Sequence, residues 1–287
     1  MFFTPHADDI ELGCPFVYLE TLRLGYNVIE VVMTDNQYGT IEDDFKGTRL
    51  KKLREKELDN ANAVFAKVTG NQVKVIRMGY IDGHLPLNKD SLNRTLDLIK
   101  KESPDLIFTC DPWYAQDFHA DHLNTGRLIY YALFRLTKKE LPTNVFYYYS
   151  YKSGFYIKCR WKDFAAIKEA LFQHKSQYSP LAVQMIITLY NKLSLIRHLL
   201  ERREISESFR EQKIEHGKPV KPPKFKEMSF RKRLIYYLFS NVTIWGYTKF
   251  YNVSPEGLGL KMDYDNQDLL KQKDLRYSYK YLKNNRK

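Results

Sequence analysis

The chain has 287 residues, with 44% hydrophobic and 28% charged, which is enough for a sizeable core in one large domain or one domain with an appendage. Its three cysteines, Cys14, Cys110 and Cys159, have no paired spacing, which excludes a disulfide framework and a cysteine-rich zinc site. The formal charge of +12 is uneven: residues 1–180 contain 24 basic and 23 acidic residues, whereas residues 181–287 contain 22 and 11. The basic excess therefore says little about the first 180 residues.

Strand-like apolar runs alternate with helix-like runs through residues 1–180. In chain order, the pattern predicts a short strand at 1–4, a helix at 14–24, a strand at 27–34, a helix at 49–67 and a strand at 73–78. A helix at 90–101, a strand at 106–110, a helix at 121–134 and strands at 145–151 and 155–161 follow. Asp90 or Ser91 is expected to be the N-cap of the helix at 90–101. Residues 152–154 favour a hairpin between the last two strands. This alternation predicts a Rossmann-like α/β fold, in which a mostly parallel sheet has helices on both faces.

The pattern changes after residue 180. Residues 181–203 have helical spacing, and residues 214–226 are rich in proline and lysine. We predict four parts: an α/β core at 1–180, a basic helical insertion with a linker at 181–230, a segment at 231–262 that closes the core, and a polar tail at 263–287.

The apolar segments indicate no signal peptide and no membrane span. Charge arrives by Asp8, and the longest apolar-aromatic run, 234–247, is shorter than the ~20 apolar residues that a span needs. We therefore expect a cytoplasmic protein. Basic residues at 197–203, 218–226 and 231–233 beside this run are typical of peripheral contact with a membrane surface. The favoured alternative is that the run belongs to the core or to an oligomer interface.

Two polar clusters follow predicted strands. Residues 5–9 (Pro-His-Ala-Asp-Asp) follow the first strand, and residues 117–122 (Asp-Phe-His-Ala-Asp-His) follow the strand at 106–110. Ligands of parallel α/β sheets bind outside the C-terminal ends of the strands. Imidazole and carboxylate together suit Zn²⁺, which in catalytic sites keeps three protein ligands and acidifies a water. A nearby carboxylate can then take the proton while that water attacks a carbonyl.

A simpler interpretation makes these carboxylates helix caps. Asp8 and Asp9 would open the helix at 14–24, and Asp121 would cap the helix at 121–134. One such cluster would be weak evidence for a metal, but two of them at strand ends favour a metal site.

The two clusters resemble the motifs of the PIG-L/LmbE-like deacetylases, His-Pro-Asp-Asp and His-x-Asp-His. Here they stand as His6-Ala7-Asp8-Asp9 and His119-Ala120-Asp121-His122. Further segments resemble the family in the same order: Thr34-Asp35, Tyr38-Gly39-Thr40, Arg54 with Glu57 and Ala61, Asp82-Gly83 with Leu85, His174 with Ser176-Gln177, and Glu256-Gly257. The loop at 38–40 and Asp111-Pro112-Trp113 are most similar to the archaeal diacetylchitobiose deacetylases.

The resemblance implies a role for each residue of the two motifs. His6, Asp9 and His122 would ligate one zinc ion, or another divalent metal, per chain. Asp8 would be the general base, and His119 would donate to the oxyanion.

Three further residues receive roles with alternatives. Asp121 would hold and polarise His119. Arg54 would bind substrate hydroxyls or a phosphate, or else pair with Glu57 or Asp59 on the helix surface. Asp82 would bind a sugar hydroxyl, or, as the favoured alternative, only form a turn with Gly83.

The sequence departs from the family pattern in three places. Ala7 stands where the motif has proline. Only five residues precede His6, so the first strand is very short or the natural chain begins upstream. The stretch from 180 to about 228 is longer than the family pattern and holds most of the basic excess.

The predicted function is therefore metal-dependent hydrolysis of an N-acetyl group on a glucosamine-type sugar, whether glycoside, oligosaccharide or glycolipid. The same mechanism on another acylated amine is the first alternative. The second is a non-catalytic protein whose basic region binds a membrane or nucleic acid, and this alternative requires an inert metal cluster. Nucleic acid is the less favoured partner, and an oligomer stays open.

Overall fold

The computed structural model describes residues 1–39, 46–117, 119–150, 153–188, 206–215, 218–220 and 230. The predicted closing segment and tail at 231–287, and most of the basic residues proposed for membrane contact, lie outside these ranges. Among the described residues, no helix is both long and apolar enough to cross a membrane. The chain divides into two compact units.

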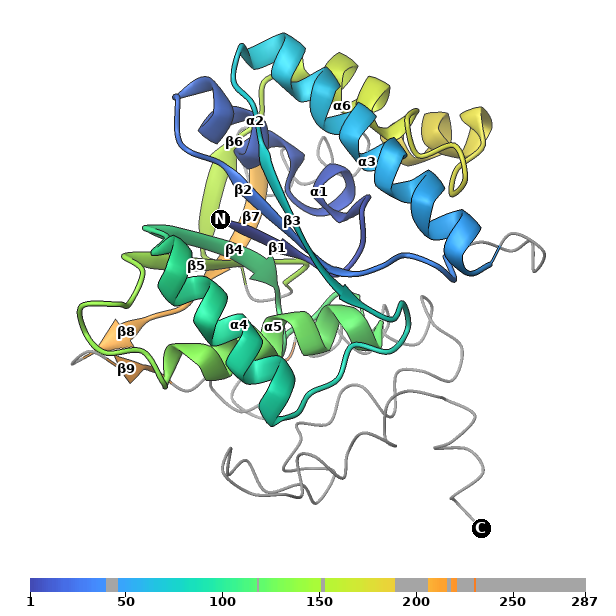
Figure 1. Cartoon of the computed structure of the whole chain (residues 1–287). Helices are drawn as coiled ribbons and strands as arrows, with labels where there is room; N and C mark the ends of the chain where they lie inside the picture. The colour runs from blue at the N-terminus through green and yellow to red at the C-terminus, as the bar shows by residue number, and fades with distance from the viewer. Residues whose placement is uncertain are drawn as a thin grey trace. The chain divides into compact units, whose positions relative to one another are not determined.

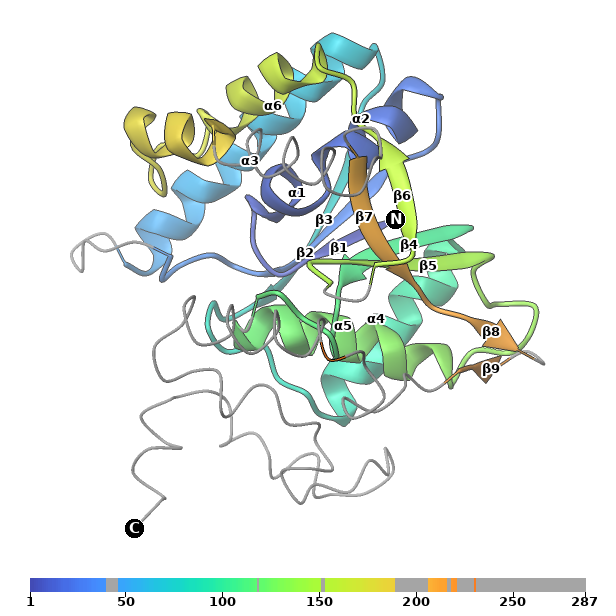
Figure 2. The same cartoon turned by 180° about the vertical axis from the view of Figure 1, so that it is seen from behind.

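The first unit, here the α3 unit, comprises Phe2–Asp82 and Phe155–Ser208. Its strands are β1 (Phe2–Thr4), β2 (Ile29–Thr34), β3 (Lys74–Tyr80) and β6 (Phe155–Lys158), and its helices are α1 (Asp9–Gly13), α2 (Pro15–Arg23), α3 (Thr48–Thr69) and α6 (Asp163–Leu171). β2 pairs in parallel with β1 and with β3. α3 and α6 lie side by side (Figures 1 and 2).

The core of the α3 unit forms where apolar helix faces meet the buried strands. Phe3, Tyr18, Val31 and Phe65 are fully buried. The rings of Tyr18 and Phe65 pack edge to face, with centroids 5.5 Å apart. α3 ends at Gly70, whose φ of 80° is the left-handed conformation that glycine adopts without strain. The expected single helix at 14–24 is α2, preceded by the short α1, because Pro15 stands at its first turn.

The second unit, here the α5 unit, comprises Met1, Gly83–Gly154 and the described residues from Phe209 onward. β4 (Leu106–Cys110) and β5 (Asn144–Tyr148) are parallel, and α4 (Lys89–Glu102) packs beside α5 (Ala120–Leu133) (Figure 1). The short strands β8 (Ile214–Glu215) and β9 (Lys218–Pro219) pair antiparallel. The predicted α/β class with mostly parallel strands is confirmed.

Helix ends and close contacts position α4 and α5. Asn88 caps α4 by accepting a hydrogen bond from the Ser91 N–H, and the Ser91 hydroxyl accepts in return from the Asn88 N–H. The predicted caps Asp90 and Ser91 are therefore wrong, by two and three positions respectively. Gly126 of α5 lies so close to the Cys110 carbonyl that any side chain there would collide with it.

Strand β7 (Ser206–Glu211) was not predicted. Its residues 210 and 211 pair antiparallel with β5, whose other edge pairs with β4. The predicted hairpin between β5 and β6 is therefore wrong, because both edges of β5 are already paired. β7 could not be recognised from the sequence, because two of its buried residues, Glu207 and Arg210, are charged.

Candidate active site

In the α3 unit, the first polar cluster lies where β1 ends. The His6 N–H donates to the Asp9 carboxylate at 2.8 Å. The His6 ring has Nδ1 3.4 Å from Asp9 and Nε2 3.2 Å from Asp82. Imidazole nitrogen beside carboxylate oxygen is the donor set that zinc prefers, so these residues fit a divalent metal.

Asp82 therefore does more than form a turn. The turn with Gly83 is present, since Gly83 has a left-handed φ of 72°. The Asp82 carboxylate is buried, faces His6, and accepts a hydrogen bond from the Tyr38 N–H at 2.9 Å. Burial raises the pKa of Asp82, but the contacts with His6 and Tyr38 outweigh it and hold the pKa below its usual range. Its binding of a sugar hydroxyl stays a prediction.

Asp8 is held by two side chains that are distant in the sequence. Arg54 Nη2 donates to one carboxylate oxygen at 3.0 Å, and the Tyr178 hydroxyl donates to the other at 2.6 Å. Burial raises the pKa of Asp8, but Arg54, the largest opposing influence, and its other polar neighbours hold it below the usual range. Asp8 occupies the N-cap position of α1 but makes no capping hydrogen bond with its side chain, which argues against the cap interpretation.

Arg54 is buried in the α3 unit. Its Nη1 donates to Gln177 at 2.9 Å and approaches the Gly39 carbonyl at 3.4 Å. A side chain at Gly39 would collide with the guanidinium. The predicted surface pair with Glu57 or Asp59 is wrong, because Glu57 accepts from Ser176 and Asp59 accepts from Arg77. Substrate binding by Arg54 stays a prediction.

The loop after α6 supplies contacts that the sequence analysis missed. Ser176, Gln177 and Tyr178 bind Glu57, Arg54 and Asp8 respectively. His174 is fully buried, with Nε2 3.5 Å from Glu11. Burial lowers the pKa of His174, but Glu11 and Asp8 outweigh it and raise the pKa above its ordinary value. The resemblance of residues 174–177 to the family indicated that this loop matters, but it assigned no function to any of these residues.

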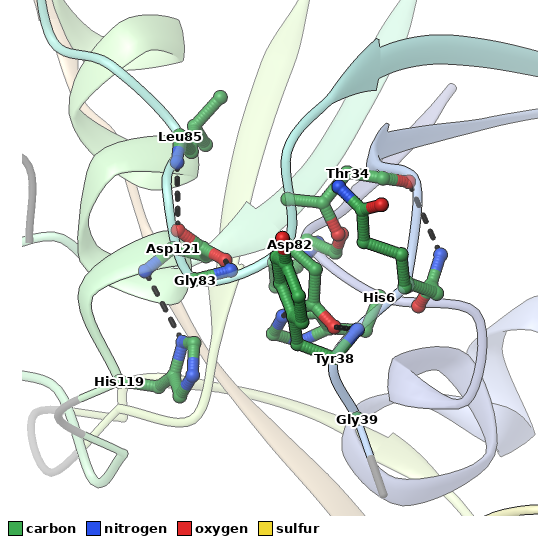
Figure 3. A network of polar contacts seen from close by, with 12 residues as sticks. His6, Thr34, Tyr38, Gly39, Asp82, Gly83, Leu85, His119 and Asp121 are labelled. Atoms are coloured by element: carbon green, nitrogen blue, oxygen red, sulfur yellow. Dashed lines mark hydrogen bonds and ion pairs between the residues drawn. The ribbon is translucent and has the colours of Figure 1, made fainter. Parts of the chain in front are cut away.

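In the α5 unit, the second cluster begins α5. His119 is the N-cap, and its Nδ1 accepts a hydrogen bond from the Asp121 N–H at 3.2 Å (Figure 3). Asp121 is therefore not the cap. Because Nδ1 accepts, the neutral imidazole carries its proton on Nε2, which is the atom that would donate to an oxyanion.

The Asp121 carboxylate has a contact that the sequence analysis did not foresee. It accepts from the N–H groups of Gly83 and Leu85 at 2.7 and 2.9 Å (Figure 3). These bonds fix the loop before α4 to the first turn of α5. The predicted polarisation of His119 by Asp121 stays a prediction.

His122 is buried in the first turn of α5. Its Nδ1 lies 3.5 Å from Asp117, and its ring stacks on Tyr149 with centroids 5.7 Å apart and planes at 24°. Among the described residues, His6 and Asp82 in the α3 unit and His119, Asp121 and His122 in the α5 unit could each offer a ligand atom to a metal.

Arg210 of β7 holds the loop between β4 and α5. Its guanidinium donates twice to Asp111, at 2.6 and 2.9 Å, and lies 4.2 Å from the Tyr147 ring centroid. Asp111 also accepts from the Ser150 hydroxyl and from the N–H groups of Trp113 and Tyr114. Burial raises the pKa of Asp111, but Arg210 outweighs it and lowers the pKa.

The chain is similar in sequence and in fold to two known deacetylases. The chain is 24% identical over 188 residues to the diacetylchitobiose deacetylase of Thermococcus kodakarensis, covering 61% of this chain and 68% of that protein. The N,N'-diacetylchitobiose deacetylase structure from Pyrococcus horikoshii matches with a TM-score of 0.65 and 21% identity, over 73% of this chain and 82% of that one.

The fold is also shared with a protein of another activity. GalB, the 4-carboxy-2-hydroxymuconate hydratase of Pseudomonas putida, matches with a TM-score of 0.57 and 14% identity, over 79% of this chain and 98% of that one. These structural matches confirm the Rossmann-like fold, while the reaction has to be argued from residues. The PIG-L family model, described as GlcNAc-PI de-N-acetylase, matches residues 1–133. That match confirms the resemblance to the PIG-L family that the two motifs predicted.

Proposed function

We propose that the chain is a metal-dependent deacetylase that removes the N-acetyl group from an N-acetylglucosamine-type sugar. One observation carries the proposal: the partly buried His6 imidazole lies between carboxylates, next to an Asp8 that is held ionised. The two diacetylchitobiose deacetylases named above support this choice among the reactions that the fold hosts.

His6, Asp9 and His122 would hold the metal. When bound, zinc or another divalent ion would act as a Lewis acid toward the acetamide carbonyl and acidify the attacking water. Asp8 takes the proton of that water on a carboxylate oxygen. His119 donates from Nε2 to the carbonyl oxygen as negative charge develops there.

The bonds and protons balance without a further reactant. A new bond joins the water oxygen to the acetyl carbon, and the bond from that carbon to the sugar nitrogen breaks. The proton taken by Asp8 goes to the leaving nitrogen. The products are acetate and the free amino sugar.

Acetate release from a panel of substrates tests the proposal. The panel contains diacetylchitobiose, a GlcNAc-phosphatidylinositol, a small N-acetylglucosaminide, and N-acylated amines that are not sugars. We expect release from one or more of the sugars after loading with zinc. Release only from the other amines would favour the first alternative, and no release from any of them would contradict the proposal.

Three substitutions assign the roles. His122→Ala should lose the metal and the activity, since one of three ligands is removed. Asp8→Asn keeps the shape of the side chain and should retain the metal while turnover falls by about 10²-fold or more. If Asp8→Asn loses the metal and Asp9→Asn keeps it, the two carboxylates have the opposite roles.

A further inference from the structure

The metal-ligand loop of this chain has an alanine where the family motif has proline. Proline would fix the φ angle next to His6 and would present no N–H. Ala7 gives up that restraint and leaves a backbone N–H at a position that is almost fully buried. A buried N–H requires an acceptor, so the chain has to supply one.

The acceptor is the side chain of Asn36. The Ala7 N–H donates to Asn36 Oδ1 at 2.9 Å, and Asn36 Nδ2 donates to the Thr34 carbonyl at 3.1 Å. Asn36 is itself buried and has a φ of 58°. Asparagine is one of the few residues that adopt this left-handed conformation readily, and here it directs the amide toward Ala7.

A second contact holds the other side of His6. The Thr34 N–H and hydroxyl both donate to the Pro5 carbonyl, at 3.1 and 2.8 Å. Residues 34 and 36, which end and follow β2, therefore fix the residues immediately before and after His6. The three segments belong to the same unit, the α3 unit.

We propose that Asn36 is a positioning residue for the metal ligand His6, and that its bond to Ala7 replaces the restraint that proline provides in the family motif. The inference rests on the proposed function, because it assigns His6 to a metal. Asn36 acts through the backbone of the loop and does not touch the metal.

A double-mutant cycle tests this substitution of one restraint for the other. Asn36→Gly keeps the left-handed backbone without strain but removes the acceptor. Ala7→Pro removes the N–H that needs it. The proline Cδ would take the place of the amide hydrogen and point at Asn36 Oδ1, which lies 2.9 Å from the Ala7 nitrogen, so the ring and the Asn36 side chain compete for the same space. Zinc affinity is measured by competition with a chromophoric chelator for the wild type, both single variants and the double variant.

We expect Asn36→Gly alone to weaken zinc binding by about tenfold or more, the effect of losing a residue that orients a metal ligand. The double variant should bind zinc nearly as the wild type does, because the proline supplies the restraint and the glycine leaves room for its ring. In the Ala7→Pro background, Asn36→Gly should cause no further loss of zinc binding, because the bond is already absent. An equal loss in both backgrounds, or no loss in either, would overturn the inference.

Three controls keep the outcome decisive. Ser103→Gly makes the same kind of replacement at another left-handed residue, φ 44°, and should leave zinc affinity unchanged. If Ala7→Pro does not fold, Asn36→Asp takes its place: it keeps an oxygen acceptor and should bind zinc more tightly than Asn36→Gly, whereas equal affinities would overturn the inference. A wild type that binds no zinc would overturn the proposed function, whereas normal zinc binding by Asn36→Gly overturns only the role of Asn36.

Discussion

The two units hold their parts of the proposed site in different ways. In the α3 unit, Asp8 is bound by Arg54 and Tyr178, which lie 46 and 170 residues away in the chain. In the α5 unit, His119 hydrogen-bonds with Asp117 and Asp121, each two residues away. A motif that caps a helix supplies much of its own geometry, whereas a buried carboxylate depends on partners from distant segments. The α3 unit should therefore be the more sensitive to substitutions far from the motif.

The largest effect is expected from Arg54→Met. It leaves the Asp8 carboxylate buried without its cation, which costs about 3–5 kcal/mol of the free energy of unfolding. Turnover should also fall by about 10²-fold or more, because the proposed base loses its fixed position. Urea denaturation and acetate release measure the two effects. Arg54→Lys, which keeps a charge but loses the planar fork, should lie between the variant and the wild type.

Stability and turnover can separate in this experiment. If Arg54→Met unfolds more readily but the folded enzyme turns over normally, Asp8 does not need Arg54 for its position. The difference between the two units would then concern stability and not turnover.

Arg210→Met is the matched substitution in the α5 unit. It leaves Asp111 buried without its cation and should also cost about 3–5 kcal/mol. Turnover of the folded protein should fall much less than for Arg54→Met, because Asp111 is not one of the proposed catalytic or metal-binding residues. The double variant Arg210→Met with Asp111→Asn removes both charges and keeps an acceptor oxygen for the neighbouring donors, so it should recover part of the stability. If Arg210→Met loses more turnover than Arg54→Met, the α5 unit is the more sensitive of the two, contrary to expectation.

Asp121→Asn tests the role of the carboxylate beside His122. An amide has one acceptor oxygen, so one of the two bonds to Gly83 and Leu85 is lost, at a cost of about 1–3 kcal/mol. If Asp121 instead acts by polarising His119, the pKa of the His119 imidazole, followed by NMR, should fall in the variant. A loss of stability with an unchanged pKa would assign Asp121 to the loop alone.

Much of the fold could be predicted from the sequence because its strands are apolar runs separated by helical periods. β2, β3 and β4 lie within two residues of their predicted bounds. β7 could not be predicted in this way, since Glu207 and Arg210 give it the charge pattern of an exposed segment. Their burial depends on partners elsewhere in the chain: Asp111 for Arg210, and the first turn of α2 for Glu207.

The candidate site likewise has a part that the sequence predicts and a part that depends on contacts between distant segments. The residue types of His6, Asp8, Asp9 and His122 suggested their chemistry, because the motifs are short and local. Their supporting contacts could not be deduced, since Tyr178 is an ordinary aromatic residue in the sequence and Asn36 an ordinary turn residue. Only the folded chain brings the Tyr178 hydroxyl to Asp8 and the Asn36 amide to the Ala7 N–H.

Glu207 is the α3-unit counterpart of Arg210 on β7. Its carboxyl accepts from the N–H groups of Phe16 and Val17 at the start of α2. Burial raises its pKa from 4.5 to about 8, in spite of these two bonds. Arg210 keeps its charge at every pH of interest, whereas Glu207 exchanges a proton near neutrality.

A pKa that is raised in the folded state makes stability fall as pH rises. Below about pH 4.5 Glu207 is protonated in both states, so its contribution is fully present. Between 4.5 and about 8 the unfolded chain releases the proton and the folded protein retains it, so the free energy of unfolding falls by up to about 1.4 kcal/mol per pH unit. Glu207→Gln cannot titrate, and its stability should therefore depend less on pH between 5 and 8. Urea denaturation at each pH measures this, with Glu215→Gln on β8 as the exposed control; parallel curves for the wild type and Glu207→Gln would show that Glu207 does not bind the proton.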